Sequence, residues 1–332
     1  MTGPLDDLLA AYGCPPVLAP VPAEPTFTVV VRTQGRRPDS LREALESLAT
    51  QHRPPAEVLL VVHDDRATAD AVAAGLVDLP DRLPLRVDSV AGGGRARPLN
   101  RGLDLASGDY VCFLDDDDLA MPDWIEAFHA AVGTAPGAMV RAVTLTQDWT
   151  TDGSEQPRRP AGPIERPFPT SFDLLAHLSL NLTPLCGLAF PRARLDPLGL
   201  RFDEQLPVYE DWDLLLRAAM VIGVISVPEA TSLYRRLDHG NADTAADVAT
   251  WERAHAAVIE RVARGPVLLP ADASRRLAGA HFVTDGESRH EIELATARVE
   301  IDRLTRSPGH WARAFGSRLG GAIRHRIAAP RR

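Results

Sequence analysis

The first part of the chain alternates between short apolar runs and a helical repeat. Residues 27–31 and 58–62 are rich in β-branched side chains, which is typical of strands buried on both faces. The apolar positions between them recur at the spacing of a helix, and Asp39 or Ser40 is placed to cap its start. A strand, a helix and a second strand in this order predict a βαβ unit with parallel strands, whose carboxyl ends form a ligand-binding edge.

A further apolar run, residues 110–114, stops at four consecutive aspartates. In an extended backbone Asp115 and Asp117 project to one side, and Asp116 and Asp118 project to the other. Carboxylates this close raise one another's pKa unless a cation lies between them, and oxygen ligands suit Mg²⁺ or Mn²⁺. The alternative is a solvated acidic loop in which Asp118 caps the next helix, and the two arrangements can coexist.

The remaining pattern continues the alternation of helices and strands. We predict helices at 67–76, 99–106, 123–132, 171–180, 209–219 and 246–264, and strands at 85–87, 139–146, 185–190 and 225–227. Five prolines between positions 157 and 169 mark a long irregular segment, which in a compact domain is usually a lid or a mobile loop. The predicted fold class is therefore α/β, with a central, mostly parallel sheet flanked by helices and a C-terminal helical extension.

Three polar features carry candidate chemistry. Three consecutive glycines precede Arg95 and Arg97, so that a phosphate could approach the backbone between two guanidinium groups, although a flexible surface loop has the same composition. Glu210 and Asp211 fall in the first turn of a predicted helix, where acids either complement the helix dipole or provide a general base. A single loop histidine such as His239 is more often a surface residue than a metal ligand.

The composition of the chain excludes several classes of protein function. The chain has 332 residues, 45% of them hydrophobic, and a net charge of −9, which is ordinary for a globular protein and argues against nucleic-acid binding. It contains no lysine, which excludes Schiff-base and P-loop lysine chemistry. No apolar run reaches the roughly 18 residues of a membrane span. The start of the chain does not resemble a secretory signal, and three cysteines fit a reduced, cytoplasmic protein.

The two ends of the chain differ from its body. Residues 1–25 form a Pro-rich arm that contains a short predicted helix at 5–12. Residues 310–332 carry six arginines and no acid, and apolar residues recur there every four positions. This pattern predicts a basic amphipathic helix that contacts the inner face of a membrane or a partner, or that packs against the body of the protein.

Taken together, residues 26–241 resemble the inverting glycosyltransferases of family 2, which have the GT-A nucleotide-sugar fold and include bacterial enzymes of cell-surface polysaccharide synthesis. The motifs occur in the order of the family. They are Val30-Val-Arg-Thr33, Asp64-Asp65, Arg95 and Arg97 with Asn100-Arg-Gly102, Ala106-Ser-Gly-Asp-Tyr110, the aspartate run, Phe202-Asp-Glu204, Glu210-Asp-Trp-Asp213 and His239. Two departures are the fourth aspartate, which leaves the metal-ligand register open, and His63-Asp-Asp-Arg66 in place of Asp-Asp-Gly-Ser.

The resemblance implies a role for each matched residue. The residues implied to bind the nucleotide sugar are Thr33, Asp64, Asp65, Arg95, Arg97, Asn100, Asp115 and Asp116, the last of these at the ribose. Those implied to bind Mg²⁺ or Mn²⁺ are Asp115, Asp117, Asp118 and His239. Asp211 is implied to be the catalytic base, beside Glu210, and its position at a helix N-terminus favours the ionised form that a base requires. The aspartate run and this pair must then meet in one cleft.

The implied domains are the arm at 1–25, a GT-A domain at 26–245 and C-terminal helices with the basic tail at 246–332. The GT-A domain divides into a nucleotide-binding half, 26–120, and an acceptor half, 121–245. The expected activity is transfer of a sugar from a nucleotide-diphosphate sugar to a carbohydrate or glycolipid hydroxyl, by a cytoplasmic protein that forms a monomer or a homo-oligomer. The alternatives are a metal-dependent sugar nucleotidyltransferase and an inactive nucleotide-sugar-binding subunit of a polysaccharide complex.

Overall fold

The structure is a computed structural model, and it describes residues 4–11, 20–151, 159–237, 248–265 and 267–269. The chain divides into two compact units, Met1–Pro270 and Ala271–Arg332, and the second lies outside the described residues. The predicted basic helix at 310–332 belongs to this second unit and so lies outside the described residues. The predicted ligand His239 belongs to the first unit and also lies outside them. Among the described helices, none combines the length and apolarity needed to cross a bilayer.

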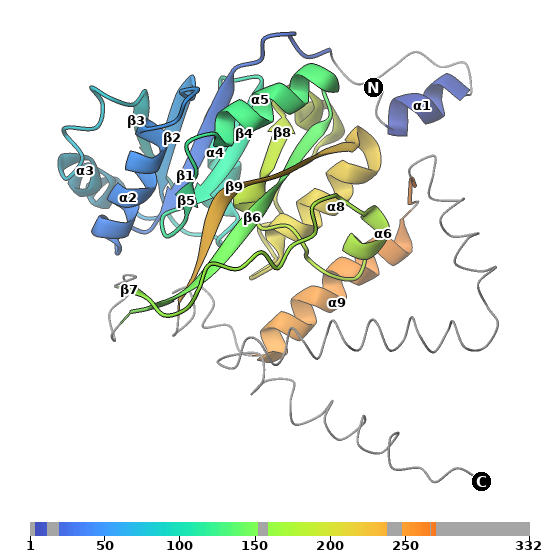
Figure 1. The fold of residues 1–332 in the computed structure, drawn as a ribbon. Helices are drawn as coiled ribbons and strands as arrows, with labels where there is room; N and C mark the ends of the chain where they lie inside the picture. The colour runs from blue at the N-terminus through green and yellow to red at the C-terminus, as the bar shows by residue number, and fades with distance from the viewer. Residues whose placement is uncertain (1–3, 12–19, 152–158, 238–247, 266, 270–332) are drawn as a thin grey trace. The chain divides into compact units, whose positions relative to one another are not determined.

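One nine-stranded sheet organises the described part of the first unit (Figure 1). Its first half is parallel, because β1 pairs with β2 on one side and with β4 on the other, and β2 pairs with β3. These strands are β1 (Phe27–Thr33), β2 (Glu57–Val62), β3 (Leu85–Ser89) and β4 (Tyr110–Asp115). They correspond to the predicted βαβ opening, and their β-branched side chains are buried on both faces as the sequence indicated.

The second half of the sheet is mixed. β8 pairs antiparallel with both β4 and β6, β6 and β9 are parallel, and β5 and β7 add short antiparallel pairings at β9 and β6. The bounds are β5 (Leu119–Ala120), β6 (Met139–Thr150), β7 (Arg159–Pro160), β8 (Leu188–Pro191) and β9 (Val224–Leu237). The α/β fold class is confirmed, with a sheet that is parallel from β1 to β4 and mixed beyond them.

Helices cover both faces of the sheet. One face of the sheet is covered by α2 (Pro38–Ala49), α3 (Arg66–Ala74) and α5 (Trp124–Thr134), whose apolar side chains pack against alternate residues of the parallel strands. Of these helices, α2 and α5 lie in front of the sheet in Figure 1. On the other face α4 (Arg97–Leu105) and α8 (Glu210–Ile222) pack on alternate residues of the same strands. The parallel strands β1, β2 and β4 are therefore buried on both faces, and their carboxyl ends are the part of them available for a site.

Shorter elements join these layers. They are α1 (Pro4–Ala11), α6 (Leu174–His177), α7 (Arg192–Leu195), the 3₁₀ turns η1 (Leu185–Gly187) and η2 (Asp196–Leu198), and α9 (Val248–Arg264). α9 buries Ala254 and Val258 against Trp212 and Leu216 of α8. The compact unit thus continues beyond residue 245, where we predicted the domain boundary.

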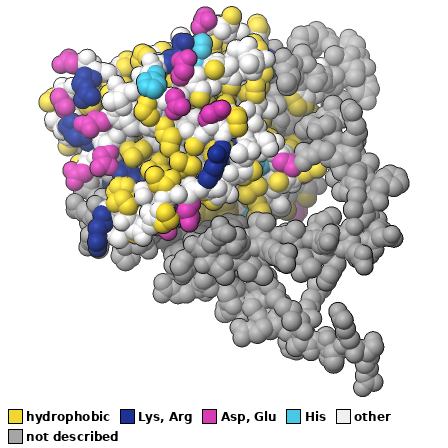
Figure 2. Space-filling view, viewed as in Figure 1, with side chains coloured by type: hydrophobic (Ala, Val, Ile, Leu, Met, Phe, Trp, Pro, Cys, Tyr) yellow, Lys and Arg dark blue, Asp and Glu magenta, His cyan; other side chains and the backbone are white. Residues whose placement is uncertain are grey.

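The charged side chains on the visible face are mixed in sign (Figure 2). Arg42 of α2 bonds Asp78 at 2.9 Å, and Arg66 of α3 bonds Asp70 at 2.9 Å. Such exposed pairs add little stability, but they balance charge locally on these two helices.

Several predicted element bounds were wrong. α2 begins at Pro38 with Arg37 at its cap position, so neither Asp39 nor Ser40 caps it. The predicted strand at 225–227 continues to Leu237, because its pairing with β6 accommodates bulges near Ala142 and Val143. The predicted helix at 171–180 is reduced to the four residues of α6.

Candidate active site

The ends of β1 and β4 bring an arginine and an aspartate together. The parallel register places Arg32 opposite Asp115, and the guanidinium donates to both carboxylate oxygens, at 2.6 and 2.8 Å. Burial alone would raise the pKa of Asp115, but Arg32 outweighs burial and holds it below its usual range. The first aspartate of the run is therefore an anion with a fixed orientation.

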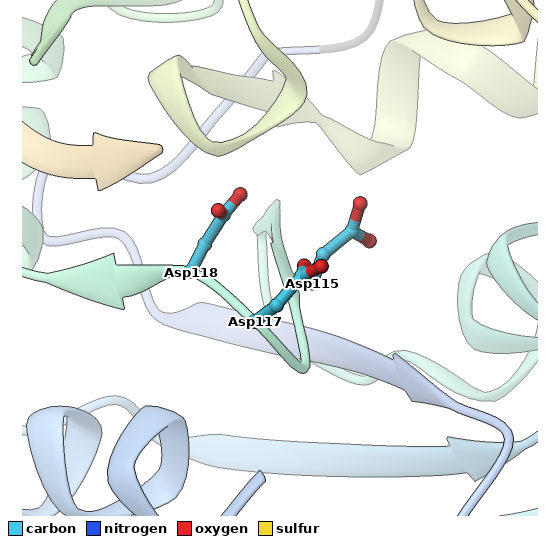
Figure 3. A group of neighbouring side chains, drawn as sticks. All are labelled: Asp115, Asp117 and Asp118. Atoms are coloured by element: carbon cyan, nitrogen blue, oxygen red, sulfur yellow. The ribbon is translucent and has the colours of Figure 1, made fainter. Parts of the chain in front are cut away.

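The aspartate run is a turn rather than an extended strand. The Asp118 N–H donates to the Asp115 carbonyl at 3.1 Å, which folds the run back toward β5. As a result Asp115, Asp117 and Asp118 each offer an oxygen within 4.8 Å of the others (Figure 3). The predicted alternation of two faces was wrong, since an extended backbone would have paired Asp116 with Asp118.

Asp116 has a separate environment. Its carboxylate accepts a 2.5 Å hydrogen bond from the Thr33 hydroxyl and a 3.1 Å bond from Arg37. It is 7% exposed, and burial raises its pKa. Thr33 and Asp116, both predicted at the nucleotide sugar, are thus bonded to each other at the ends of β1 and β4.

The three clustered carboxylates repel one another, and their pairing with Arg32 and Arg37 offsets only part of this repulsion. Burial, and then the neighbouring aspartates, raise the pKa of Asp117 to about 7, and burial with Asp117 and Asp115 raises that of Asp118. Arg37 bonds Asp117 at 2.8 Å, but each carboxylate oxygen keeps a second lone pair for a ligand. Three hard oxygen donors that repel one another fit a divalent cation such as Mg²⁺ or Mn²⁺.

Asp118 does not cap the following helix, because α5 begins only at Trp124. Its carboxylate instead accepts the backbone N–H of Arg235 in β9 at 3.1 Å. The Arg235 guanidinium is fully buried, bonds the Asp117 carbonyl and Glu43, and stacks over Trp149. β9 therefore stabilises the aspartate turn through the backbone and the guanidinium of Arg235.

The predicted catalytic pair lies at the same site. Glu210, the first residue of α8, is 2% exposed and accepts hydrogen bonds from Arg32 at 2.9 Å and from Arg95 at 2.7 Å. Burial alone would raise the pKa of Glu210, but Arg95 and Arg32 outweigh it and hold the pKa below its usual range. Arg32 bonds both Asp115 and Glu210, so the aspartate run and the Glu-Asp pair meet as we expected.

Asp211 has the opposite electrostatic environment. Burial, and then the charge of Glu210, raise the pKa of Asp211 to about 6, against the opposing effect of Arg95 and Arg32. We expected the helix N-terminus to favour the ionised form, but these two effects are larger. The nearest side-chain donor is Asn181, at 3.3 and 3.4 Å from its two oxygens. A carboxylate with this pKa is mostly ionised near neutrality and is still basic enough to accept a proton.

The backbone at Tyr209 aims this pair. Tyr209, the residue before α8, has φ +65°, and among the described residues it is the one non-glycine with a positive φ. Such a conformation costs about 1 kcal/mol or more and clusters at functional sites. The Tyr209 ring packs edge-on against Trp212 and Trp251, with centroids at 5.3 and 4.8 Å. Aromatic packing therefore maintains the turn that presents Glu210 and Asp211.

The predicted base-binding acids lie at the end of β2. Asp65 caps α3, because its carboxylate accepts the Thr68 N–H at 2.8 Å, and these bonds lower its pKa. Asp64 is exposed and accepts the Asp65 N–H at 2.8 Å. The next residue before them, His63, hydrogen-bonds through its backbone to Thr33 at the end of β1. The two parallel strand ends thus form one polar edge.

The glycine and arginine loop connects the two halves of the domain. The Asn100 amide donates to the Phe202 carbonyl at 2.9 Å and accepts the Phe202 N–H at 3.0 Å, and Arg97 lies 3.5 Å from Glu204. Gly93 has φ +73°, and a Cβ there would lie 2.4 Å from the Arg97 side chain, so this turn requires glycine. Asn100 and Arg97 therefore fix the loop, and Arg95 is the arginine of this group that reaches the acidic site.

The sequence analysis missed four residues of the site. Arg32, Arg37, Arg235 and Asn181 were not singled out as site residues, although Arg32 stood within a matched motif. The available signal was their position, since Arg32 comes one residue before the predicted Thr33 in a strand that ends at the ligand-binding edge. The composition gave no such signal, because every basic residue in the chain except the histidines is an arginine.

Comparisons with known proteins identify the family of the chain. Residues 28–190 match the family model described as glycosyl transferase family 2. The succinoglycan biosynthesis protein ExoO of Rhizobium meliloti is 31% identical over 261 residues, which cover 72% of this chain and 71% of that protein. The glucosyl-dolichyl phosphate glucuronosyltransferase of Haloferax volcanii is 32% identical, over 37% of this chain and only 39% of the relative's length.

Among solved structures, the mannosyltransferase PcManGT of Pyrobaculum calidifontis, in complex with GDP-Man and Mn²⁺, is similar with a TM-score of 0.51 and 19% identity. The alignment covers 96% of this chain and 93% of that one, and it supports the GT-A fold. S. aureus TarS residues 1–349 in complex with UDP give a TM-score of 0.50 at 21% identity, over 70% of this chain and 65% of the other. The fold, the ordered motifs and these matches lead to one conclusion: the chain belongs to glycosyl transferase family 2.

Proposed function

We propose that the protein is a metal-dependent, inverting glycosyltransferase that acts in polysaccharide or glycoconjugate synthesis. The observation that carries this proposal is the double pairing of Arg32, which joins a cluster of candidate cation ligands to Glu210, the buried member of the Glu-Asp pair. Sugar transfer needs these two functions side by side, one for the leaving diphosphate and one for the attacking hydroxyl.

On the donor side Asp115, Asp117 and Asp118 would hold Mg²⁺ or Mn²⁺. When bound, such an ion neutralises the charge that develops on the leaving diphosphate. Arg95, whose Nε bonds Glu210 and whose side chain is 19% exposed, lies beside this position and adds a fixed positive charge. Asp64 and the Thr33–Asp116 pair would face the base and ribose at the ends of β2 and β1.

On the acceptor side Asp211 would act as the general base. As the acceptor oxygen forms its bond to the anomeric carbon, its proton passes to the Asp211 carboxylate. The bond from the anomeric carbon to the phosphate oxygen breaks, and its electron pair leaves with the nucleoside diphosphate. Attack from the side opposite the leaving group inverts the anomeric carbon in one displacement. Glu210 stays ionised between Arg32 and Arg95 and fixes the first turn of α8.

The acceptor is proposed to be a carbohydrate or a glycolipid, because ExoO is named for the synthesis of the polysaccharide succinoglycan and the Haloferax volcanii relative for a dolichyl phosphate substrate. We place the protein in the cytoplasm, with the 310–332 tail at the inner face of the membrane. These assignments rest on the relatives and on the arginine pattern of the tail.

The nucleotidyltransferase alternative is less well supported. It requires a basic residue at the first loop that grips a triphosphate, and the candidate Arg32 is already bonded to Asp115 and Glu210. The inactive-subunit alternative is disfavoured by a half-buried Asp211 with a raised pKa, since a binding subunit gains nothing from that cost.

The test is a panel of UDP-, GDP-, dTDP- and CMP-sugars with Mn²⁺ or Mg²⁺, with release of the nucleotide followed over time. The proposal expects slow hydrolysis of at least one donor, faster turnover when the acceptor is added, and loss of both with EDTA. Pyrophosphate release from a nucleoside triphosphate and a sugar phosphate would instead indicate the nucleotidyltransferase. Donor binding without any turnover would indicate the inactive subunit.

A further inference from the structure

The segment between residues 169 and 183 carries a buried polar network that the proposed mechanism does not use. At its centre is Arg141 of β6, which is 0% exposed. Its described partners are neutral, namely the Thr183 hydroxyl at 3.1 Å and the carbonyls of Pro169 and Leu182. Burial lowers the pKa of Arg141 to about 10, so it remains a cation at neutral pH. A charge buried on backbone carbonyls is costly and indicates that the conformation of this segment matters.

His177 continues the network. Its Nδ1 lies 2.7 Å from the Asp173 carbonyl, which can only accept, so Nδ1 carries the proton. Burial lowers the pKa of His177 to about 4, so the ring is neutral and Nε2 accepts the Thr183 hydroxyl proton at 2.9 Å. The Thr183 oxygen can then accept a hydrogen bond from Arg141. In this arrangement the His177 ring, the Thr183 hydroxyl and the Arg141 Nε all have hydrogen-bond partners. The segment is thereby locked to β6 in one arrangement.

A second attachment joins the segment to α8. The indole Nε1 of Trp212 donates to the His177 carbonyl at 2.7 Å. Trp212 is the residue after Asp211 and is fully buried. The distance between the segment and the candidate base is therefore set by a hydrogen bond one residue away from that base.

This network determines which way Asn181 faces. The Asn181 side-chain oxygen accepts the Thr183 N–H at 3.2 Å, so its NH₂ group must point the other way. That group lies 3.3 and 3.4 Å from the two oxygens of Asp211. The other charged groups that act on Asp211 are Glu210, on its own helix, and Arg95 and Arg32, on the opposite side of the site.

We propose that Asn181 is a positioning residue for Asp211: held by the N–H of Thr183, whose own position Arg141 fixes, the Asn181 amide orients the base carboxylate toward the acceptor and stabilises its ionised form. The inference deepens the proposed function and rests on Asp211 as its base. The Asn181 amide does not compete with Asp211 for the proton of the acceptor hydroxyl, because an amide does not titrate near neutrality.

Two variants of the full chain separate this role from packing. Asn181→Asp has the same shape and still accepts the Thr183 N–H, but it replaces the donor facing Asp211 with an oxygen. Asn181→Ala removes both bonds. Ser179→Ala is the matched control, because Ser179 lies two residues away, is exposed, and its hydroxyl bonds only the Ala176 carbonyl within the described residues, while its own carbonyl, which His255 contacts, is unchanged by the substitution. Thermal melting of each variant checks that it is folded.

The first readout is the pKa of Asp211 in metal-free protein, measured by ¹³C NMR of its carboxyl group, with the resonance identified by its loss in Asp211→Asn. We expect Asn181→Ala to raise this pKa by roughly half a unit. Asn181→Asp should raise it by about one unit or more, because two neighbouring carboxylates then share a proton. Ser179→Ala should leave it unchanged. A pKa of Asp211 that does not move in either folded Asn181 variant overturns the inference.

The second readout is sugar transfer. We expect kcat to fall roughly 10- to 100-fold in Asn181→Ala and further in Asn181→Asp, with an unchanged KM for the donor. The acid limb of the pH profile should move upward with the NMR value. A fall in kcat without a shift of that limb would mean a merely structural role and would overturn the inference. If wild-type protein transfers no sugar, the proposed function fails, while the NMR titration still decides whether Asn181 acts on Asp211.

Discussion

The aspartate turn after β4 and the first turn of α8 meet at Arg32, and they manage buried charge differently. In the aspartate turn the carboxylates crowd one another, and the pKa values of Asp117 and Asp118 rise for that reason in addition to burial. In α8 the two acids are divided, since Glu210 takes two guanidinium partners and Asp211 takes an amide.

This difference shows how one site can contain both a group of candidate metal ligands and a catalytic base. Crowding favours cation binding by a group of carboxylates, because a cation relieves their repulsion without protonating them. A single carboxylate becomes basic where burial and one charged neighbour act on it: burial and Glu210 raise the pKa of Asp211 to about 6, while Arg95 and Arg32 hold that of Glu210 below its usual range. Adjacent residues with opposite pKa shifts are a pattern of acid–base sites.

The largest effect should come from the base. Asp211→Asn should reduce transfer by about a thousandfold or more, because the amide cannot accept the proton of the acceptor. Donor affinity, measured by calorimetry, should survive. Asp213→Asn is the control in the same turn, since Asp213 bonds Arg217 and Arg261 rather than the site. Loss of donor binding in a folded Asp211→Asn protein would count against the assignment.

The next effect should come from the crowded acids. Asp117→Ala should remove metal dependence and activity together, by roughly a hundredfold or more. Mn²⁺ should raise the melting temperature of the wild type, because a ligand that binds only the folded state stabilises it, and this increase should disappear in the variant. Turnover by Asp117→Ala that no longer needs metal would contradict the ligand assignment.

Arg32 tests the connection between the two groups. Arg32→Met should lower the free energy of unfolding by about 3–5 kcal/mol, because Asp115 and Glu210 then lose a buried partner. Adding Glu210→Gln should restore part of that loss, since it removes one uncompensated charge. Chemical denaturation measures both. Equal stability of the single and double variants would mean that Glu210 does not depend on Arg32.

The smallest effect is the pH dependence of Asp211. Because the base must be ionised and its pKa is about 6, kcat/KM should fall about tenfold per unit below pH 6.

The raised pKa of Asp211 also means that its ionised form destabilises the folded protein at neutral pH, and this cost disappears as the pH falls from about 6 to 4. Asp211→Asn should therefore be more stable than wild type by about 1–3 kcal/mol at pH 7 and equal near pH 4. A less stable variant at pH 7 would reverse the sign of this argument.

The sequence predicted the parallel strands and the two acidic groups well, because both have local signals. Buried strands such as β1 and β2 are continuous apolar runs, and the motifs fixed which acids follow them. The two-residue strands β5 and β7 were not predicted, because pairing with β9 and β6 rather than local propensity forms them.

The arginines and the geometry of the aspartate turn could not be predicted. Arg235 acts on Asp117 and Asp118 across more than a hundred residues of sequence, so nothing near it indicates its partner. The turn itself depends on Arg235 and Ser40, which bond its backbone and its carboxylates only in the folded protein. The roles of all the predicted site residues, Asp64, Asp65 and His239 among them, stay predictions.

The left-handed backbone at Tyr209 has a consequence for protein engineering. A stabilisation campaign would choose glycine at this position, since glycine adopts a positive φ without strain. That exchange would remove the ring that packs against Trp212 and Trp251 and would loosen the start of α8. The strain relieved by glycine is about 1 kcal/mol, whereas truncating a packed aromatic ring costs about 3 kcal/mol or more. Glycine at residue 209 should therefore give a less stable protein with a slower reaction, and the position is better left unchanged.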